Sequence, residues 1–253
     1  MASRSRPGVT GGGGSEPSSA RRWAGGEVHA RARVGAVAVL AAVCTFVAVF
    51  AVSVGASGTA YVWHLNMISD LGDPSCHVRD GRWICSPGHV VFNTGLVLTG
   101  GLLAVAGALL VRLWGRVLAG SVVVMGTGLV VAGVFTATDH GPLHLLGVVL
   151  ALVAPGLGLL WSAARPETAW LEPHRVVRGL LAAVALVLAA ESRLPDPVIP
   201  RGAGELGIVL CLVTALAVEA VRLRPTSRSA DGTAATASAS RTAAPRSGAS
   251  ARR

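Results

Sequence analysis

Long apolar runs alternate with shorter polar segments along most of this chain. Six runs are rich in Val, Leu, Ala and Gly and almost free of charge, and they cover about 34–57, 90–113, 117–136, 142–164, 176–190 and 206–221. A helix of about 20 apolar residues crosses the hydrocarbon core of a bilayer. The pattern therefore predicts an all-α, polytopic membrane protein, with six transmembrane helices packed as a bundle over residues 34–222.

Small residues and prolines predict how some of these helices are shaped. In the second run, Gly100, Ala104 and Ala108 recur every four positions. Such a stripe of small residues lets two helices approach closely. In the fourth run, Pro142 fits the first turn of a helix, whereas Pro155 predicts a kink in the helix interior.

The segments that flank the membrane domain differ from it in composition. Residues 1–33 are rich in Gly, Ser and Arg, and residues 223–253 are rich in Arg, Ser, Ala and Thr, so both are predicted to be disordered. The first apolar run is too long for a signal-peptide core, so we expect a retained helix, with cleavage near Ala56 as the alternative. At the end of the last run, Glu219 and Arg222 are expected to form an exposed pair at the interface.

Charge predicts the orientation in the membrane. Hydrophobic residues make up 52% of the chain and charged residues 14%, and the net charge of +9 comes from 22 basic residues, all arginine. A pI near 11.2 would suit a nucleic-acid partner, but most of the arginines fall in four segments, which are 1–33, 112–116, 165–178 and 219–253. With these segments on the cytoplasmic side, the positive-inside rule is obeyed and both termini are cytoplasmic. The outer loops are then 58–88, 137–141 and 191–205.

The longest of these outer loops carries two of the four cysteines. A polar connection of this length between two helices is unusual unless it has a role of its own. Cys76 and Cys85 both lie in it, and no second CxxC pair is nearby to complete a zinc site. Because the loop is expected to face an oxidising compartment, we predict a disulfide between them. Cys44 and Cys211 lie within apolar runs, where a thiol behaves as a small hydrophobic group.

Polar residues gather at the predicted outer ends of the spans. We predict that five of them converge beneath the long loop, between the first four spans, to form a polar binding site: Ser69, Asp70, Asn93, Asp139 and His144. An apolar bundle has no packing reason to keep two carboxylates, a histidine and an amide at one depth. Alternatively, Asp139 caps a helix, Asp70 belongs to a turn, and Asn93 only bonds to a neighbouring helix.

Two histidines raise the question of a metal. His140 and His144 are four residues apart, so both lie on one face if the helix begins early enough. Asp70 or Asp139 would then supply a carboxylate ligand or a general base. The Gly141-Pro142 pair can instead break this register. No cofactor is expected, because the chain has no Gly-rich phosphate loop, GxSxG elbow or HExxH motif.

Three motifs resemble a known family of bacterial membrane proteins. They are ISDLG ending at residue 72, VFNTG over 91–95 and GVFTATDHGPLHLLG over 133–147. Together with six predicted spans over 34–222, they resemble the family called domain of unknown function 998. The resemblance implies a six-helix membrane fold whose biochemical role is not established. The cysteine-bearing segment 74–88 is an elaboration on the family pattern.

Three classes of function follow from this pattern. We expect a multi-pass membrane protein that binds a lipid or a protein partner through its extracytoplasmic face, with no nucleic-acid partner. The alternative is an enzyme that acts on a lipid or lipid-linked substrate at the outer leaflet through Asp70, Asp139 and His144. A transporter is less favoured, because no span carries a charge near its centre.

Overall fold

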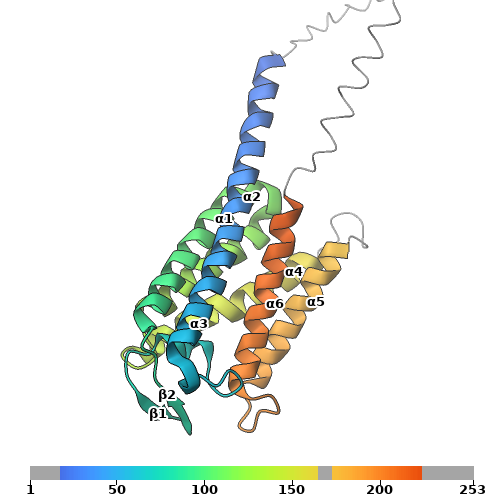
Figure 1. Ribbon diagram of the computed structural model, residues 1–253. Coiled ribbons are helices and arrows are strands. Elements are labelled where there is room, and N and C mark those ends of the chain that lie inside the picture. The colour runs from blue at the N-terminus through green and yellow to red at the C-terminus, as the bar shows by residue number, and fades with distance from the viewer. Residues whose placement is uncertain (1–17, 165–172, 224–253) are drawn as a thin grey trace, which may run out of the picture.

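The computed structural model describes residues 18–164 and 173–223 (Figure 1). The chain is mostly helical, and the main helices in order are α1 (Ser18–Ser57), α2 (His89–Val134), α3 (Gly141–Val148), α4 (Ala154–Ala164), α5 (Pro173–Glu191) and α6 (Arg201–Arg222). Three short helical segments join them, η1 (Gly58–Ala60), η2 (Ile68–Gly72) and η3 (Val149–Val153). Within the described residues, five helices are long and apolar enough to cross a membrane, with α3, η3 and α4 forming one of them.

Helix α1 begins earlier than the hydropathy pattern predicts. It starts at Ser18 rather than near Val34, so residues 18–33 are helical in the structure and not part of an unfolded segment. Figure 1 shows this end of α1 projecting beyond the other helices. Residues 1–17 and 224–253, also predicted to be disordered, lie outside the described residues.

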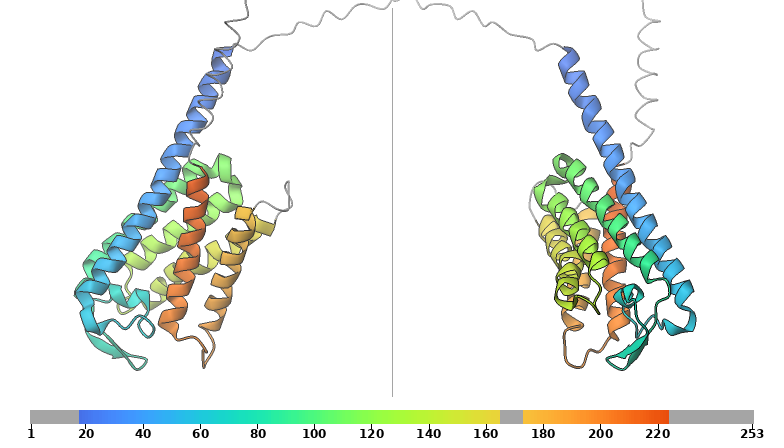
Figure 2. Two further views of the ribbon diagram at one scale, coloured as in Figure 1. Left: turned by 45° about the vertical axis from the view of Figure 1, so that its right-hand side comes forward. Right: turned by 90° about the vertical axis from the view of Figure 1, so that its left-hand side faces the viewer.

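Helix α2 contains two predicted spans, and the chain reverses between them. Its 46 residues would extend about 70 Å as one straight helix, more than twice the hydrocarbon core. Gly115 has φ 75° and ψ 166°, a conformation that only glycine adopts readily, and the two arms of α2 meet there. The arms then run side by side, as the right view of Figure 2 shows.

Close packing of the two α2 arms depends on small residues. A Cβ atom added to Gly126 would collide with the carbonyl oxygen of Gly100 and lie 2.8 Å from the backbone nitrogen of Ala104. Further along, a Cβ on Gly107 would lie 2.8 Å from the carbonyl oxygen of Ala119. Two of the small residues predicted to allow close approach, Gly100 and Ala104, therefore lie in the contact between the arms.

The next long apolar stretch, Gly141–Ala164, contains a π-helical segment near its middle. This segment, η3, immediately precedes Ala154 and Pro155. Proline has no N–H to donate and its ring presses on the carbonyl four residues earlier, so a local widening of the helix accommodates it. Next to the kink predicted at Pro155, the structure has a π-helical turn. Gly128 of α2 packs against the backbone of this span at Ala151.

The helices form a ring in chain order. Helix α1 packs on α2, α2 packs on the α3–α4 span, α4 packs on α5, α5 packs on α6, and α6 closes the ring against α1. Leu103, Leu110, Leu212 and Leu216 are among the fully buried side chains at the centre. The interior is therefore apolar, and the polar chemistry lies at the ends of the bundle.

The long loop departs from the all-α prediction because it contains a small β-hairpin. Strand β1 (His77–Arg79) pairs antiparallel with β2 (Arg82–Ile84). Asp80 and Gly81 connect them, both with positive φ, as a tight hairpin turn requires. The Asp-Gly pair between two short extended segments was the signal for this turn in the sequence.

Candidate functional site

The hairpin is attached to η2 by an ion pair. The Arg82 guanidinium donates from Nε to Asp70 Oδ2 at 2.8 Å and from Nη2 to Asp70 Oδ1 at 3.1 Å. Asp70 Oδ2 also accepts the backbone N–H of Met67, at 2.9 Å. The Asp70 side chain is only 3% exposed, so both oxygens are buried and both are bonded. Its hydrogen bonds to Arg82 raise the pKa of that guanidinium above its ordinary value.

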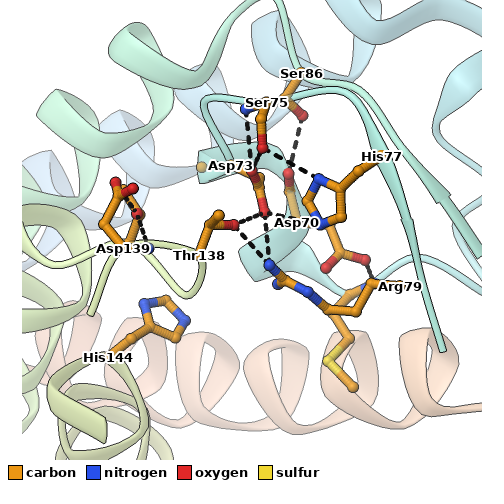
Figure 3. Close-up of polar contacts among 12 residues, drawn as sticks. Asp70, Asp73, Ser75, His77, Arg79, Ser86, Thr138, Asp139 and His144 are labelled. Carbon is orange, nitrogen blue, oxygen red and sulfur yellow. Dashed lines mark hydrogen bonds and ion pairs between the residues drawn. The ribbon is translucent and has the colours of Figure 1, made fainter. Parts of the chain in front are cut away.

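A second carboxylate, Asp73, organises the base of the hairpin. Asp73 Oδ2 accepts hydrogen bonds from Thr138 Oγ1 at 2.5 Å and from Arg79 Nη2 at 3.1 Å (Figure 3). Asp73 Oδ1 accepts the backbone N–H and the hydroxyl of Ser75. Burial raises the pKa of Asp73, but these hydrogen bonds and the Arg79 charge outweigh it, and the net pKa lies below its ordinary value. Asp73 thereby links the hairpin to the turn before α3.

The predicted disulfide is present and closes the hairpin. Cys76 and Cys85 flank the two strands, and their Cα atoms lie 4.2 Å apart. A third tie comes from Asn66, whose Nδ2 donates to the Trp83 carbonyl at 2.8 Å. Covalent and polar links together hold this loop as a cover over the end of the bundle.

Beside this cover lies a cavity of about 460 Å³. Its polar lining residues come from η2, from the hairpin, from His144 of α3, and from the ends of α5 and α6 that adjoin the loop between them. Its apolar lining comes mainly from the α3–η3 segment and from α6. The polar lining residues are Ser69, Asp70, Arg79, Asp80, Arg82, His144, Ser192, Arg193, Arg201 and Glu205. The apolar wall includes Leu145, Val148, Leu152, Val153 and Ile208.

Three of the five predicted site residues meet at this cavity. Ser69 and Asp70 of η2 line it together with His144 of α3, a segment far away in the sequence. His144 Nδ1 lies 2.8 Å from the Phe135 carbonyl, which fixes the ring and makes Nδ1 the protonated nitrogen. Its Nε2 is buried and has no hydrogen-bond partner among the described residues. His144 therefore lines the cavity with an Nε2 lone pair that has no partner among the described residues.

The other two predicted residues have different positions. Asn93 Nδ2 donates to the Gly72 carbonyl at 2.9 Å and so ties η2 to the first turn of α2. Asp139 is exposed and accepts the Thr136 hydroxyl at 2.6 Å, and Figure 3 shows it apart from Asp70 and Asp73. Neither is among the described residues that line the cavity. In the structure, Asn93 and Asp139 therefore hold neighbouring segments of the chain in place and do not line the cavity.

The histidine pair does not share one helix. Helix α3 begins at Gly141, and His140 precedes it with a non-helical φ of −139°. Its ring packs edge-on against Phe135, with the centroids 5.5 Å apart. Across the described part of the chain, no group of three His, Cys, Asp or Glu side chains is placed to hold a metal ion.

The cavity is also lined by residues outside the predicted set of five. Arg193 lies in the loop between α5 and α6, and Arg201 begins α6. Glu205, one turn later, accepts the Ile68 backbone N–H at 2.7 Å and so joins α6 to η2. The sequence did offer a signal for these two arginines, because arginine is scarce in the predicted outer loops, which contain only four.

At the opposite end of α6, the predicted exposed pair is part of a buried network. Arg222 does pair with Glu219, at 3.2 Å, but Glu219 is only 1% exposed. Its other oxygen accepts Arg178 of α5 at 2.5 Å, and Arg178 is also buried. The surface-pair prediction is therefore wrong for Glu219, which needs two arginines because a single buried carboxylate would remain poorly compensated.

Comparison of the chain with protein-family models, with curated proteins and with solved structures finds no match.

Proposed function

We propose that this protein crosses the cell membrane six times, with both termini in the cytoplasm and the hairpin outside. The reversal of α2 at Gly115 supports six crossings, because each arm is long enough to cross the hydrocarbon core. The arginine-rich segments support the orientation. An outer location also suits the Cys76–Cys85 disulfide. We also propose membership of the family called domain of unknown function 998, because the three motifs named above resemble that family.

Cysteine labelling in intact cells tests the orientation. Gly8→Cys and Ser240→Cys are made singly in a background in which Cys44 and Cys211 are alanine. Neither position should react with a membrane-impermeant maleimide until the cells are opened. Asp196→Cys, in the exposed loop before α6, is the positive control and should react in intact cells. Labelling of position 8 or 240 in intact cells would overturn the orientation.

At its outer end, the protein binds a membrane amphiphile in the cavity beneath the hairpin. The observation that carries this function is the composition of the cavity, whose lining combines charged and hydroxyl groups with an aliphatic wall. Its volume of about 460 Å³ is within the usual range of small-molecule sites, about 300–1,000 Å³. Leu145 on the wall is 47% exposed, so the cavity adjoins the surface that faces lipid.

Binding is favoured over catalysis by the state of the two carboxylates. A general base needs a free oxygen within reach of its substrate. Asp70 uses both of its oxygens on Arg82 and Met67. Asp139 lies outside the cavity lining and bonds to Thr136. Of the proposed catalytic set, only His144 both lines the cavity and has a polar atom without a hydrogen-bond partner among the described residues.

A matched pair of substitutions tests amphiphile binding. Leu145 lines the cavity and Leu146 does not, yet the two are neighbours on α3 with 47% and 49% exposure. Leu145→Trp should displace the bound amphiphile and reduce the amount that copurifies and is counted by native mass spectrometry. Leu146→Trp should leave that amount unchanged. Equal retention of amphiphile by the two variants would contradict the proposed function.

A further inference from the structure

The cavity gathers every arginine of the predicted outer loops. These loops contain four arginines, and all four line it: Arg79, Arg82, Arg193 and Arg201. They come from two loops more than a hundred residues apart in the sequence, so local composition does not explain their convergence. Arginine is sparse on the outer side of membrane proteins. Its concentration at one cavity therefore points to a ligand.

Two of the four arginines are already neutralised by acids. Arg79 pairs with Asp73, and Arg82 pairs with Asp70 and Asp80. The other two differ, because the guanidinium groups of Arg193 and Arg201 form no hydrogen bond or ion pair with any residue that the structure describes. The cavity lining therefore contains two guanidinium groups with no acidic partner among the described residues, and guanidinium groups of this kind bind anions.

The remaining acid of the lining does not pair with these two arginines. Glu205 accepts backbone hydrogen bonds from Ile68 and Ser69, which direct its carboxylate toward η2. Asp70 and Asp80 likewise face Arg82. The acids of the lining thus hold η2 and the hairpin in place, and they leave the charges of Arg193 and Arg201 uncompensated.

Neutral polar groups complete the environment. The Ser69 hydroxyl lines the cavity and makes no hydrogen bond with a described residue. The buried His144 Nε2 accepts a hydrogen bond from an O–H group when the ring is neutral, and donates a hydrogen bond when the ring is charged. Phosphate diesters present acceptor oxygens, which guanidinium, hydroxyl and protonated imidazole groups bind, and phosphate monoesters can also donate an O–H to a neutral imidazole.

Building on the amphiphile-binding function proposed above, we infer that the ligand is an amphiphile with a phosphate-bearing headgroup. Arg193 and Arg201 bind the phosphate oxygens, and Ser69 and His144 Nε2 provide further hydrogen bonds. The acyl chain lies along the wall formed by Leu145, Val148 and Leu152. Arg193 and Arg201 are thereby the residues that select for charge, and the aliphatic wall accepts many chains.

Headgroup preference in the full-length, detergent-purified protein tests the inference. The probes are phosphatidylglycerol and an uncharged diacylglycerol with the same acyl chains, with bound lipid counted by native mass spectrometry. The wild-type protein should prefer phosphatidylglycerol. Arg193→Gln and Arg201→Gln should each reduce that preference at least about tenfold, which corresponds to about 1.4 kcal/mol and so to the lower end of the range for a hydrogen bond to a charged group. Arg201→Lys should retain part of the preference, because the charge remains while the bidentate geometry is lost.

Arg116→Gln is the matched control. Arg116 is exposed beside Gly115, where the two α2 arms meet, and lies outside the cavity lining. It should keep the wild-type preference. Glutamine variants that keep both the melting temperature and the wild-type preference would overturn the inference. If a glutamine variant melts at a lower temperature, Arg201→Lys replaces it in the test. A wild-type preference for phosphatidylglycerol in Arg201→Lys would then also overturn the inference.

Three further outcomes separate this inference from the function on which it rests. Equal binding of phosphatidylglycerol and diacylglycerol by the wild-type protein would overturn the phosphate headgroup and leave amphiphile binding intact. Absence of both lipids, together with no difference between Leu145→Trp and Leu146→Trp, would overturn amphiphile binding itself. Inorganic phosphate that displaces phosphatidylglycerol at millimolar concentration would support the phosphate site and identify free phosphate as a second source of its ligand.

Discussion

Arg82 of the hairpin binds Asp70 of η2 through two hydrogen bonds, with Nε 2.8 Å from one carboxylate oxygen and Nη2 3.1 Å from the other. The two side chains are 10% and 3% exposed, so water does not replace either partner when the other is removed. The pair joins β2 to η2 and forms part of the cavity wall. It therefore couples the stability of the loop to the shape of the candidate binding site.

Removal of Arg82 alone should be strongly destabilising. Arg82→Gln leaves the buried Asp70 carboxylate without its counter-charge, a change that typically costs about 3–5 kcal/mol. The measurement is the free energy of hairpin opening from amide hydrogen exchange in detergent. In the Asp70→Asn/Arg82→Gln double variant, no buried charge is left unpaired, so the loss should be smaller than for Arg82→Gln. Additive losses from the two single changes would show that the pair is not coupled.

The disulfide should stabilise the same loop by a smaller amount. Cys76 and Cys85 enclose a loop with a sequence separation of nine, for which chain entropy alone gives about 2–3 kcal/mol. A Cys76→Ser/Cys85→Ser variant should therefore exchange its hairpin amides faster while the amides of α5 and α6 are unaffected. Unchanged exchange in the hairpin would mean that Asn66, Asp70 and Asp73 suffice to hold the loop.

Acid should loosen the base of the hairpin through Asp73. The pKa of Asp73 is lower in the folded protein than its ordinary value of 3.8, so the ionised form stabilises the fold. This contribution is complete above about pH 5 and is lost as the pH falls through the lowered pKa. Fluorescence of Trp83, which is 51% exposed on the hairpin, should change in this range.

Two variants assign that acid step. Asp73→Asn should remove it and weaken the loop at neutral pH as well. His77 lies 3.8 Å from Asp73, so the titration is repeated with His77→Asn to exclude the histidine as its origin. An acid step that persists in Asp73→Asn would assign the titration to another group.

The contact between the two arms of α2 should not tolerate a larger residue. Gly126→Val would place side-chain atoms against the backbone of Gly100 and Ala104, and overpacking of this kind costs about 1–3 kcal/mol or more. The expected result is a lower melting temperature in detergent. Gly101→Val is the control, because nothing lies within 4 Å of a Cβ at that position. Equal melting temperatures for the two variants would contradict the packing of the arms.

Hydropathy and residue chemistry along the chain were sufficient to predict several features. The apolar runs identify helices able to cross a membrane because that property depends on length and composition within one segment. The disulfide was predictable because its two cysteines share one short loop. Gly100 and Ala104 marked a close helix contact because spacing on a single helix defines its face.

Long-range packing decided the rest. Nothing local to Arg193 or Arg201 indicates that they meet Ser69 and His144, since these residues approach only after α3, α5 and α6 are packed together. Asn93 is likewise placed by packing between distant segments, since its amide donates to the Gly72 carbonyl and the residue does not line the cavity. Hydrophobic patterning specifies which segments are buried in the membrane. Only the relative rotation and depth of the packed helices decide which polar side chains share a cavity, and those depend on contacts between distant residues.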